Sequence, residues 1–127
     1  ATYRMNDTDG PRRRQIVVSS DRPEGPYSEP FYIDEDGIDP SLFHDDDGRS
    51  YMLLNRGARI LELDLEKGRQ LTPAVLLFYG DQKRAPEGPH LLKKDGFLFF
   101  FVSLHKNYLK DAVLLYGVGR IGYTTKH

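Results

Sequence analysis

The stretches GIDPSLFHDDDGRSYMLLN (Gly37–Asn55) and RAPEGPHLLKKDGFLFFFV (Arg84–Val102) carry the same features in the same order. Each has a carboxylate beside a proline, then a short apolar segment, an Asp-Gly pair and a longer apolar segment. Short apolar segments bounded by Gly, Pro and Asp are typical of β-strands, and Asp-Gly favours the type I′ turn of a hairpin. The sequence therefore predicts two copies of a strand–turn–strand unit.

The two units recur at a fixed spacing. The pair Asp47–Gly48 and the pair Asp95–Gly96 are 48 residues apart (95 − 47), and the same shift places Asp39 on Glu87. A period of roughly 40 to 50 residues, with about four strands in each, is that of a β-propeller blade. In a propeller the innermost strands line a central channel, so equivalent positions of successive blades face one space. We therefore expect Asp39 and Glu87 to share the mouth of such a channel.

The rest of the chain indicates an all-β fold, because helix signals are scarce. The segment Asp64–Leu71 resembles a longer hairpin connection with Gly68 at its sharp position. Strands are expected near Gln15–Ser20, Phe31–Ile33, Ser41–His44, Arg49–Asn55, Ala58–Asp64, Ala74–Tyr79, His90–Lys93, Gly96–Ser103 and Ala112–Val118.

Composition limits the possible partners. The 127 residues include 18 Lys plus Arg and 19 Asp plus Glu, which argues against nucleic acid or an anionic membrane as the main partner. The one basic run, Arg12–Arg14, is interpreted as a solvated loop. Cysteine is absent, so neither disulfides nor thiolate metal sites are available. No apolar run approaches membrane-spanning length, and the compartment stays open between cytoplasm and secretion.

Two carboxylates held on proline-stiffened loops suit the hydrolysis of a glycosidic bond. One protonates the leaving oxygen, and another activates water or attacks carbon. Glu87 is the better candidate for the acid because its side chain is longer, while Asp39 is placed to orient it. The alternative interpretation is that Asp39 belongs to an ordinary Asp-Pro turn and that Glu87 is simply solvated.

The motifs GIDPSLFHDDDGRSYML and EGPHLLKKDGFLFFFV resemble family 43 of the glycoside hydrolases, whose members are five-bladed β-propellers that include β-xylosidases, α-L-arabinofuranosidases and arabinanases. The upstream segment Gln15–Ile33 resembles the outer part of the preceding blade. The resemblance implies a partial propeller of two to three blades of antiparallel four-stranded sheets. It also implies an oligo- or polysaccharide substrate and neither cofactor nor metal.

Site residues follow from the same resemblance. It implies that Glu87 is the general acid, that Asp39 modulates the pKa of that acid and holds it in place, and that Ile38 lines the sugar pocket. The mechanism of the family is inverting and needs a general base. No residue of this chain is assigned as the base, because Asp7 and Asp9 lie in a segment, Arg4–Arg14, that is interpreted as a loop.

The predicted organisation is a single incomplete propeller domain: residues 1–36 end one blade, residues 37–84 form one blade, and residues 85–127 start the next and add a divergent tail. Such a piece exposes strand edges and apolar faces, so we expect self-association, with Ala112–Gly119 as one place of pairing. A non-catalytic β module that binds carbohydrate or assembles with other chains is the alternative function. Sugar preference and attack at chain ends or interiors stay open.

Overall fold

The computed structural model describes residues 1–7, 10–55, 57–77, 86–104 and 113–118. These residues form strands and turns, and among them no helix is present that is long and apolar enough to cross a bilayer. The strands are β1 (Thr2–Asp7), β2 (Gly10–Val17), β3 (Phe31–Ile33), β4 (Ile38–His44), β5 (Ser50–Asn55), β6 (Arg59–Asp64), β7 (Arg69–Gln70), β8 (Val75–Leu76), β9 (Pro86–Lys94), β10 (Phe97–Leu104) and β11 (Val113–Val118).

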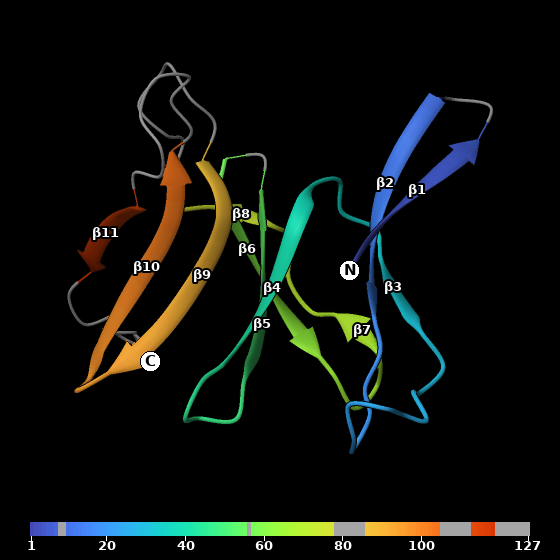
Figure 1. Cartoon of the computed structure of the whole chain (residues 1–127), viewed down its shortest axis with the longest axis horizontal. Coiled ribbons are helices and arrows are strands. Elements are labelled where there is room, and N and C mark those ends of the chain that lie inside the picture. The colour runs from blue at the N-terminus through green and yellow to red at the C-terminus, as the bar shows by residue number, and fades with distance from the viewer. Residues whose placement is uncertain (8–9, 56, 78–85, 105–112, 119–127) are drawn as a thin grey trace, which may run out of the picture.

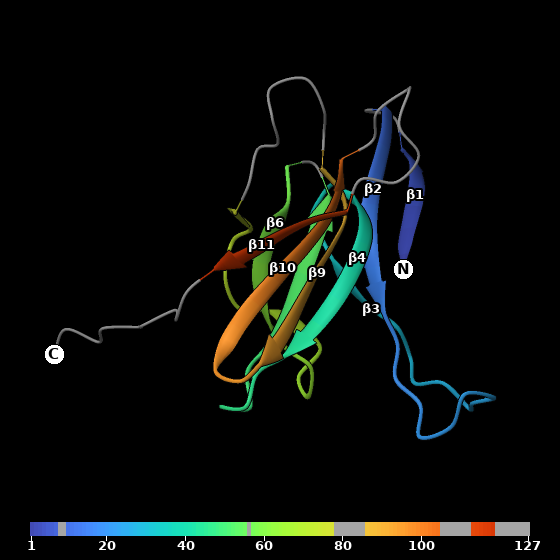
Figure 2. The ribbon, with the colours of Figure 1, turned by 60° about the vertical axis from the view of Figure 1, so that its left-hand side comes forward.

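The strands make three antiparallel sheets that stand side by side (Figure 1). The first has the order β1-β2-β3, the central one β4-β5-β6-β7 with β8 paired to β6, and the third β11-β10-β9. The inner strands β4 and β9 lie next to each other in both Figure 1 and Figure 2, although they belong to different sheets. The expected all-β class is therefore confirmed. Within the described residues the central sheet has five strands and each outer sheet has three, where the sequence predicted four per sheet.

Two apolar clusters fill the spaces between the sheets. The cluster between the first and central sheets contains Val17, Ile33, Met52, Leu54, Leu61 and Leu63. The cluster between the central and third sheets contains Phe43, Leu53, Ala58, Phe100 and Val102. Neighbouring residues of β5 alternate between the two, because successive side chains of a strand point to opposite faces. Both faces of the central sheet are thus buried.

The two hairpin turns differ, although the sequence predicts the same turn for both. The pair Asp95–Gly96 has φ angles of 52° and 76°, as a type I′ turn requires. In the pair Asp47–Gly48 only the glycine has positive φ, at 85°. Its amide donates to the carbonyl of Asp45 at 3.0 Å, and the Asp45 amide bonds the Arg49 carbonyl. This is a three-residue loop built on a type I turn, one residue longer than predicted.

The N-terminal segment is also different from its prediction. Arg4–Arg14 is not a loop, because β1 pairs with β2 from Thr2↔Gln15 to Asp7↔Gly10. Asp9 lies outside the described residues. The predicted solvated run Arg12–Arg14 belongs to β2.

Two members of that arginine run meet the acidic linker between β3 and β4. Arg13 Nε lies 3.1 Å from Asp36 Oδ1, and Arg14 Nε lies 2.9 Å from Asp34 Oδ1. The positive charges of these two arginines therefore neutralise two of the negative charges of the linker.

The linker enters β4 at a fixed position. Gln15 is fully buried, accepts a hydrogen bond from Thr2 Oγ1 at 2.7 Å, and donates to the carbonyls of Glu35 and Gly37 at 3.0 and 3.1 Å. Gly37 has a φ of 154°, and a Cβ there would lie 2.6 Å from the carbonyl oxygen of Asn55. Only glycine permits this approach of the linker to β5. These contacts therefore fix the backbone immediately before Ile38, which is the first residue of β4 and the first predicted site residue.

Candidate active site

Both inner strands carry a β-bulge at the same place. In β4 the pairs Ile38↔Asn55 and Ser41↔Leu53 leave two residues, Asp39 and Pro40, opposite one residue of β5. In β9 the pairs Glu87↔Ser103 and His90↔Phe101 leave Gly88 and Pro89 opposite one residue of β10. Each bulge begins with a residue in the left-handed region, Asp39 at 53° and Gly88 at 56°. Proline fits the second position, because a bulged residue is not required to donate to the ladder.

The two bulges contact each other across the boundary between the sheets. The amide of Gly88 donates to Asp39 Oδ2 at 3.3 Å. The hydroxyl of Ser41 donates to the carbonyl of Pro89 at 2.5 Å, and this bond is buried. Asp39 and Glu87 are both exposed beside these contacts. The structure therefore brings together the starts of the two strands that carry the predicted acids.

The bulges correct the predicted alignment of the two units by one residue. By strand pairing, Asp39 in β4 is equivalent to Gly88 in β9, a shift of 49 residues (88 − 39). In the same alignment Ile38 in β4 is equivalent to Glu87 in β9. The second strands keep the predicted shift of 48, as Leu54 and Val102 show (102 − 54). The shifts of 49 and 48 residues differ by one because the turn between β9 and β10 is one residue shorter than the turn between β4 and β5. Asp39 and Glu87 are thus neighbours without being equivalent.

Ile38 precedes the first bulge and is half-buried. Its partner across the sheet, Asn55, is buried, as is the position that follows the bulge, Ser41. Glu87 makes no hydrogen bond or ion pair with its side chain in the described part of the chain. Its side chain is exposed.

The opposite ends of β4 and β9 are held by charge. Lys93 Nζ lies 2.5 Å from Asp45 Oδ1 and 2.9 Å from Asp46 Oδ2. The hydrogen bond from Lys93 lowers the pKa of Asp45, and the bonds to Asp45 and Asp46 raise the pKa of Lys93. The two inner strands are therefore fixed to each other at both ends.

Sequence reasoning missed two polar residues that build this site, Gln15 and Ser41. Each had a detectable signal. Gln15 lies two residues before Val17, so the two side chains share a face of β2, and both are buried. Ser41 lies two residues before Phe43, and side chains two apart on a strand share a face, so this spacing could have indicated that Ser41 points inward. No group of three or more histidine, aspartate or glutamate side chains that could hold a metal ion occurs among the described residues.

The family model of glycosyl hydrolases family 43 matches residues 2–116, and the chain belongs to this family. A xylosidase/arabinosidase of Butyrivibrio fibrisolvens is 43% identical over 101 residues, which are 66% of this chain and 20% of that protein. A xylan 1,3-beta-xylosidase of a Vibrio species is 39% identical over 98 residues, 68% of this chain and 18% of that protein. The chain thus spans about a fifth of the length of these relatives.

Solved structures show the same similarity. The GH43 protein BlXynB of Bacillus licheniformis superposes with a TM-score of 0.75 and 42% identity, over 86% of this chain and 22% of that one. A mutant form of BlXynB gives a TM-score of 0.79 with 39% identity, over 94% and 25%. The structural neighbours are β-propellers, so the three sheets are part of a propeller, as the sequence predicted.

Proposed function

We propose that this chain is part of a glycoside hydrolase that cleaves O-glycosidic bonds of xylan- or arabinan-type saccharides with inversion. The observation that carries the proposal is the hydrogen bond from the Gly88 amide to Asp39, which joins the loops of the two acids. Family membership supports the reaction class, and relatives described as xylosidases and arabinosidases support the substrate class.

The two acids have different roles in this proposal. Glu87 is the general acid, because its exposed carboxyl group is not held by a neighbour in the described part of the chain. Asp39 is its modulator and orients it, because the hydrogen bond from the Gly88 amide to Asp39 Oδ2 joins the two loops. Ile38 lines the sugar pocket, and its place at the start of β4 matches that of Glu87 in β9. A third carboxylate, about 6.5–9.5 Å from the acid, acts as the base and is not assigned to this chain.

The blade division proposed from the sequence is 1–36, 37–84 and 85–127. It is supported by the three sheets, which occupy β1–β3, β4–β8 and β9–β11. We also propose that the chain self-associates through its outer sheets.

The test compares turnover of an aryl xyloside and an aryl arabinofuranoside by the unchanged chain and by Glu87→Gln. A general acid contributes about 10²–10⁴-fold, so kcat falls by that order in the variant. The loss is smaller with a nitrophenyl than with an alkyl leaving group, because the better leaving group needs less protonation. This dependence separates an acid from a residue that only binds sugar.

The matched control is Glu66→Gln, which removes an exposed carboxyl group from the turn between β6 and β7. It leaves turnover unchanged. Equal turnover by Glu87→Gln on every leaving group would contradict the assignment of the acid. Sugar binding by the unchanged chain without turnover would favour the non-catalytic module.

A further inference from the structure

Ser41 forms the one buried bond between the two bulges within the described residues. Its side chain is 8% exposed, and its acceptor, the carbonyl of Pro89, belongs to a fully buried residue. A buried carbonyl that loses its donor keeps the cost of desolvation without compensation. The hydroxyl of Ser41 therefore supplies the hydrogen bond that the buried carbonyl of Pro89, the second residue of the β9 bulge, requires.

This bond joins β9 to β4, two strands that are not paired with each other in a sheet. The strands β4 and β9 belong to different sheets, so no ladder of backbone hydrogen bonds joins them. At this end the bonds between them in the described chain are Ser41 to Pro89, which is buried, and Gly88 to Asp39, which is exposed. Water competes with the exposed bond and is excluded from the buried one. Of these two hydrogen bonds, the buried one from Ser41 therefore contributes more to holding the β9 bulge against β4.

Only Gly88 separates Pro89 from Glu87. We propose that Ser41 is a positioning residue, which holds the bulge that carries Glu87 against Asp39. The proposal rests on the proposed function of these two acids. Ser41 touches no substrate and acts through the carbonyl of Pro89. Positioning of this kind matters because reacting groups displaced by about 1 Å lose much of their rate.

The test uses the amide resonance of Gly88, followed by NMR as the full chain is titrated with acid. A carboxylate acceptor deshields the amide proton, so protonation of Asp39 moves this resonance. The titration is carried out with Glu87→Gln, so that the neighbouring carboxyl group adds nothing. Asp39→Asn abolishes the response and shows that it reports the bond between the bulges.

In Ser41→Ala the response of Gly88 loses most of its amplitude, while Ser41→Thr, which keeps a hydroxyl group, retains it. Ser50→Ala is the matched control, because the Ser50 hydroxyl bonds His44 Nδ1 at 2.9 Å at the far end of the same hairpin. That variant keeps the full response. If the alanine variant does not fold, Ser41→Cys keeps the volume with a weak donor and gives the same loss.

The outcomes separate the two proposals. A full response in a folded Ser41→Ala or Ser41→Cys chain overturns the role of Ser41 and leaves the proposed function intact. A Gly88 resonance that is insensitive to acid with Asp39 present overturns the contact on which both proposals rest.

Discussion

Asp39 adopts a backbone conformation that does not favour its residue type. Its φ of 53° lies in the left-handed region, where the other bulge has Gly88. This conformation costs an L-residue with a side chain about 1–2 kcal/mol, and aspartate tolerates it better than most. Glycine would serve the bulge at no conformational cost. The carboxylate at this position is therefore explained by the site better than by the fold.

Two substitutions of Asp39 test this explanation. We expect Asp39→Gly to keep or raise the free energy of unfolding, by up to about 1 kcal/mol, because glycine relieves the left-handed conformation. Asp39→Ala keeps the conformational cost and loses the bond to Gly88, so it lowers the free energy by about 1 kcal/mol. Urea denaturation measures both. A glycine variant less stable than the alanine variant would assign Asp39 to the fold.

At the scale of strands, the sequence predicted element types better than their registers. Apolar runs bounded by Gly, Pro and Asp located β4, β5, β6 and β10, because burial of alternate side chains determines such strands. The segment Arg4–Arg14 was misjudged because its charges are balanced by a linker distant in sequence. The slip of one residue between Asp39 and Glu87 arose from the turn lengths, which two similar Asp-Gly pairs conceal. Ser41 was missed because its acceptor belongs to another sheet.

The ion pair between β9 and the turn after β4 makes stability depend on pH. The pKa of Asp45 is lowered from 3.8, mainly by the bond from Lys93, so its contribution is complete above pH 3.8 and is lost as the pH falls through the lowered value. The pKa of Lys93 is raised from 10.5, mainly by the bonds to Asp45 and Asp46. Its contribution is complete below pH 10.5 and is lost as the pH rises through the raised value.

Lys93→Met is therefore expected to lower the urea midpoint at pH 7 and to have a shrinking effect as the pH falls below 3.8. The midpoint difference also decreases in high salt, because the pair is partly exposed. The control is Lys94→Met, since Lys94 forms no ion pair in the described part of the chain. A Lys93→Met effect that stays constant from pH 7 to pH 3 would show that the lysine stem, and not its charge, joins the sheets.

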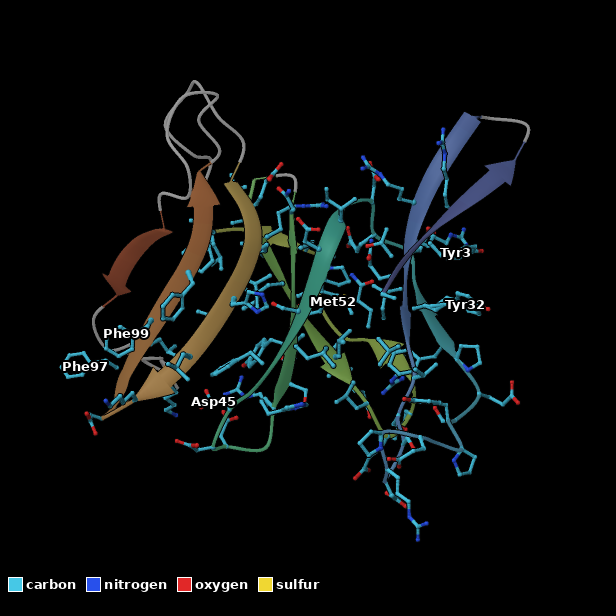
Figure 3. The ribbon with its side chains drawn as sticks, viewed as in Figure 1. Tyr3, Tyr32, Asp45, Met52, Phe97 and Phe99 are labelled. Atoms are coloured by element: carbon cyan, nitrogen blue, oxygen red, sulfur yellow. The ribbon has the colours of Figure 1, made fainter. Side chains whose placement is uncertain are left out.

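At the scale of the whole molecule, the two outer sheets each have a face with no sheet packed on it within the described chain. Figure 3 shows Phe97 and Phe99 on the side of β10 that points away from the central sheet. It also shows Tyr3 and Tyr32 on the far side of the first sheet, with ring centroids 5.8 Å apart. In the central sheet Tyr51, the position equivalent to Phe99, packs against the apolar cluster between the central and third sheets. Both outer faces are thus suited to contact another sheet.

We expect copies of this chain to associate through these faces. Phe97 is 51% exposed and Leu92 50%, and burying them against a second sheet stabilises the pair by the removal of apolar surface from water. Part of the segment predicted for pairing, Val113–Val118, is β11 at the edge of the third sheet, while positions 112 and 119 lie outside the described residues. Sedimentation velocity at micromolar concentration should give masses above the 14.6 kDa of one chain.

Phe97→Asp places a charge on the uncovered face of the third sheet and is expected to shift the distribution toward the single chain. Leu71→Asp is the control, since Leu71 is similarly exposed, at 47%, but follows β7 of the central sheet and belongs to neither outer sheet. The unchanged chain sedimenting as a monomer over the whole concentration range would contradict the association. If both variants dissociate the assembly equally, the contact is general to exposed apolar residues. A selective effect of Phe97→Asp would instead mean that the outer face of the third sheet packs against a sheet of another copy, as its inner face packs against the central sheet.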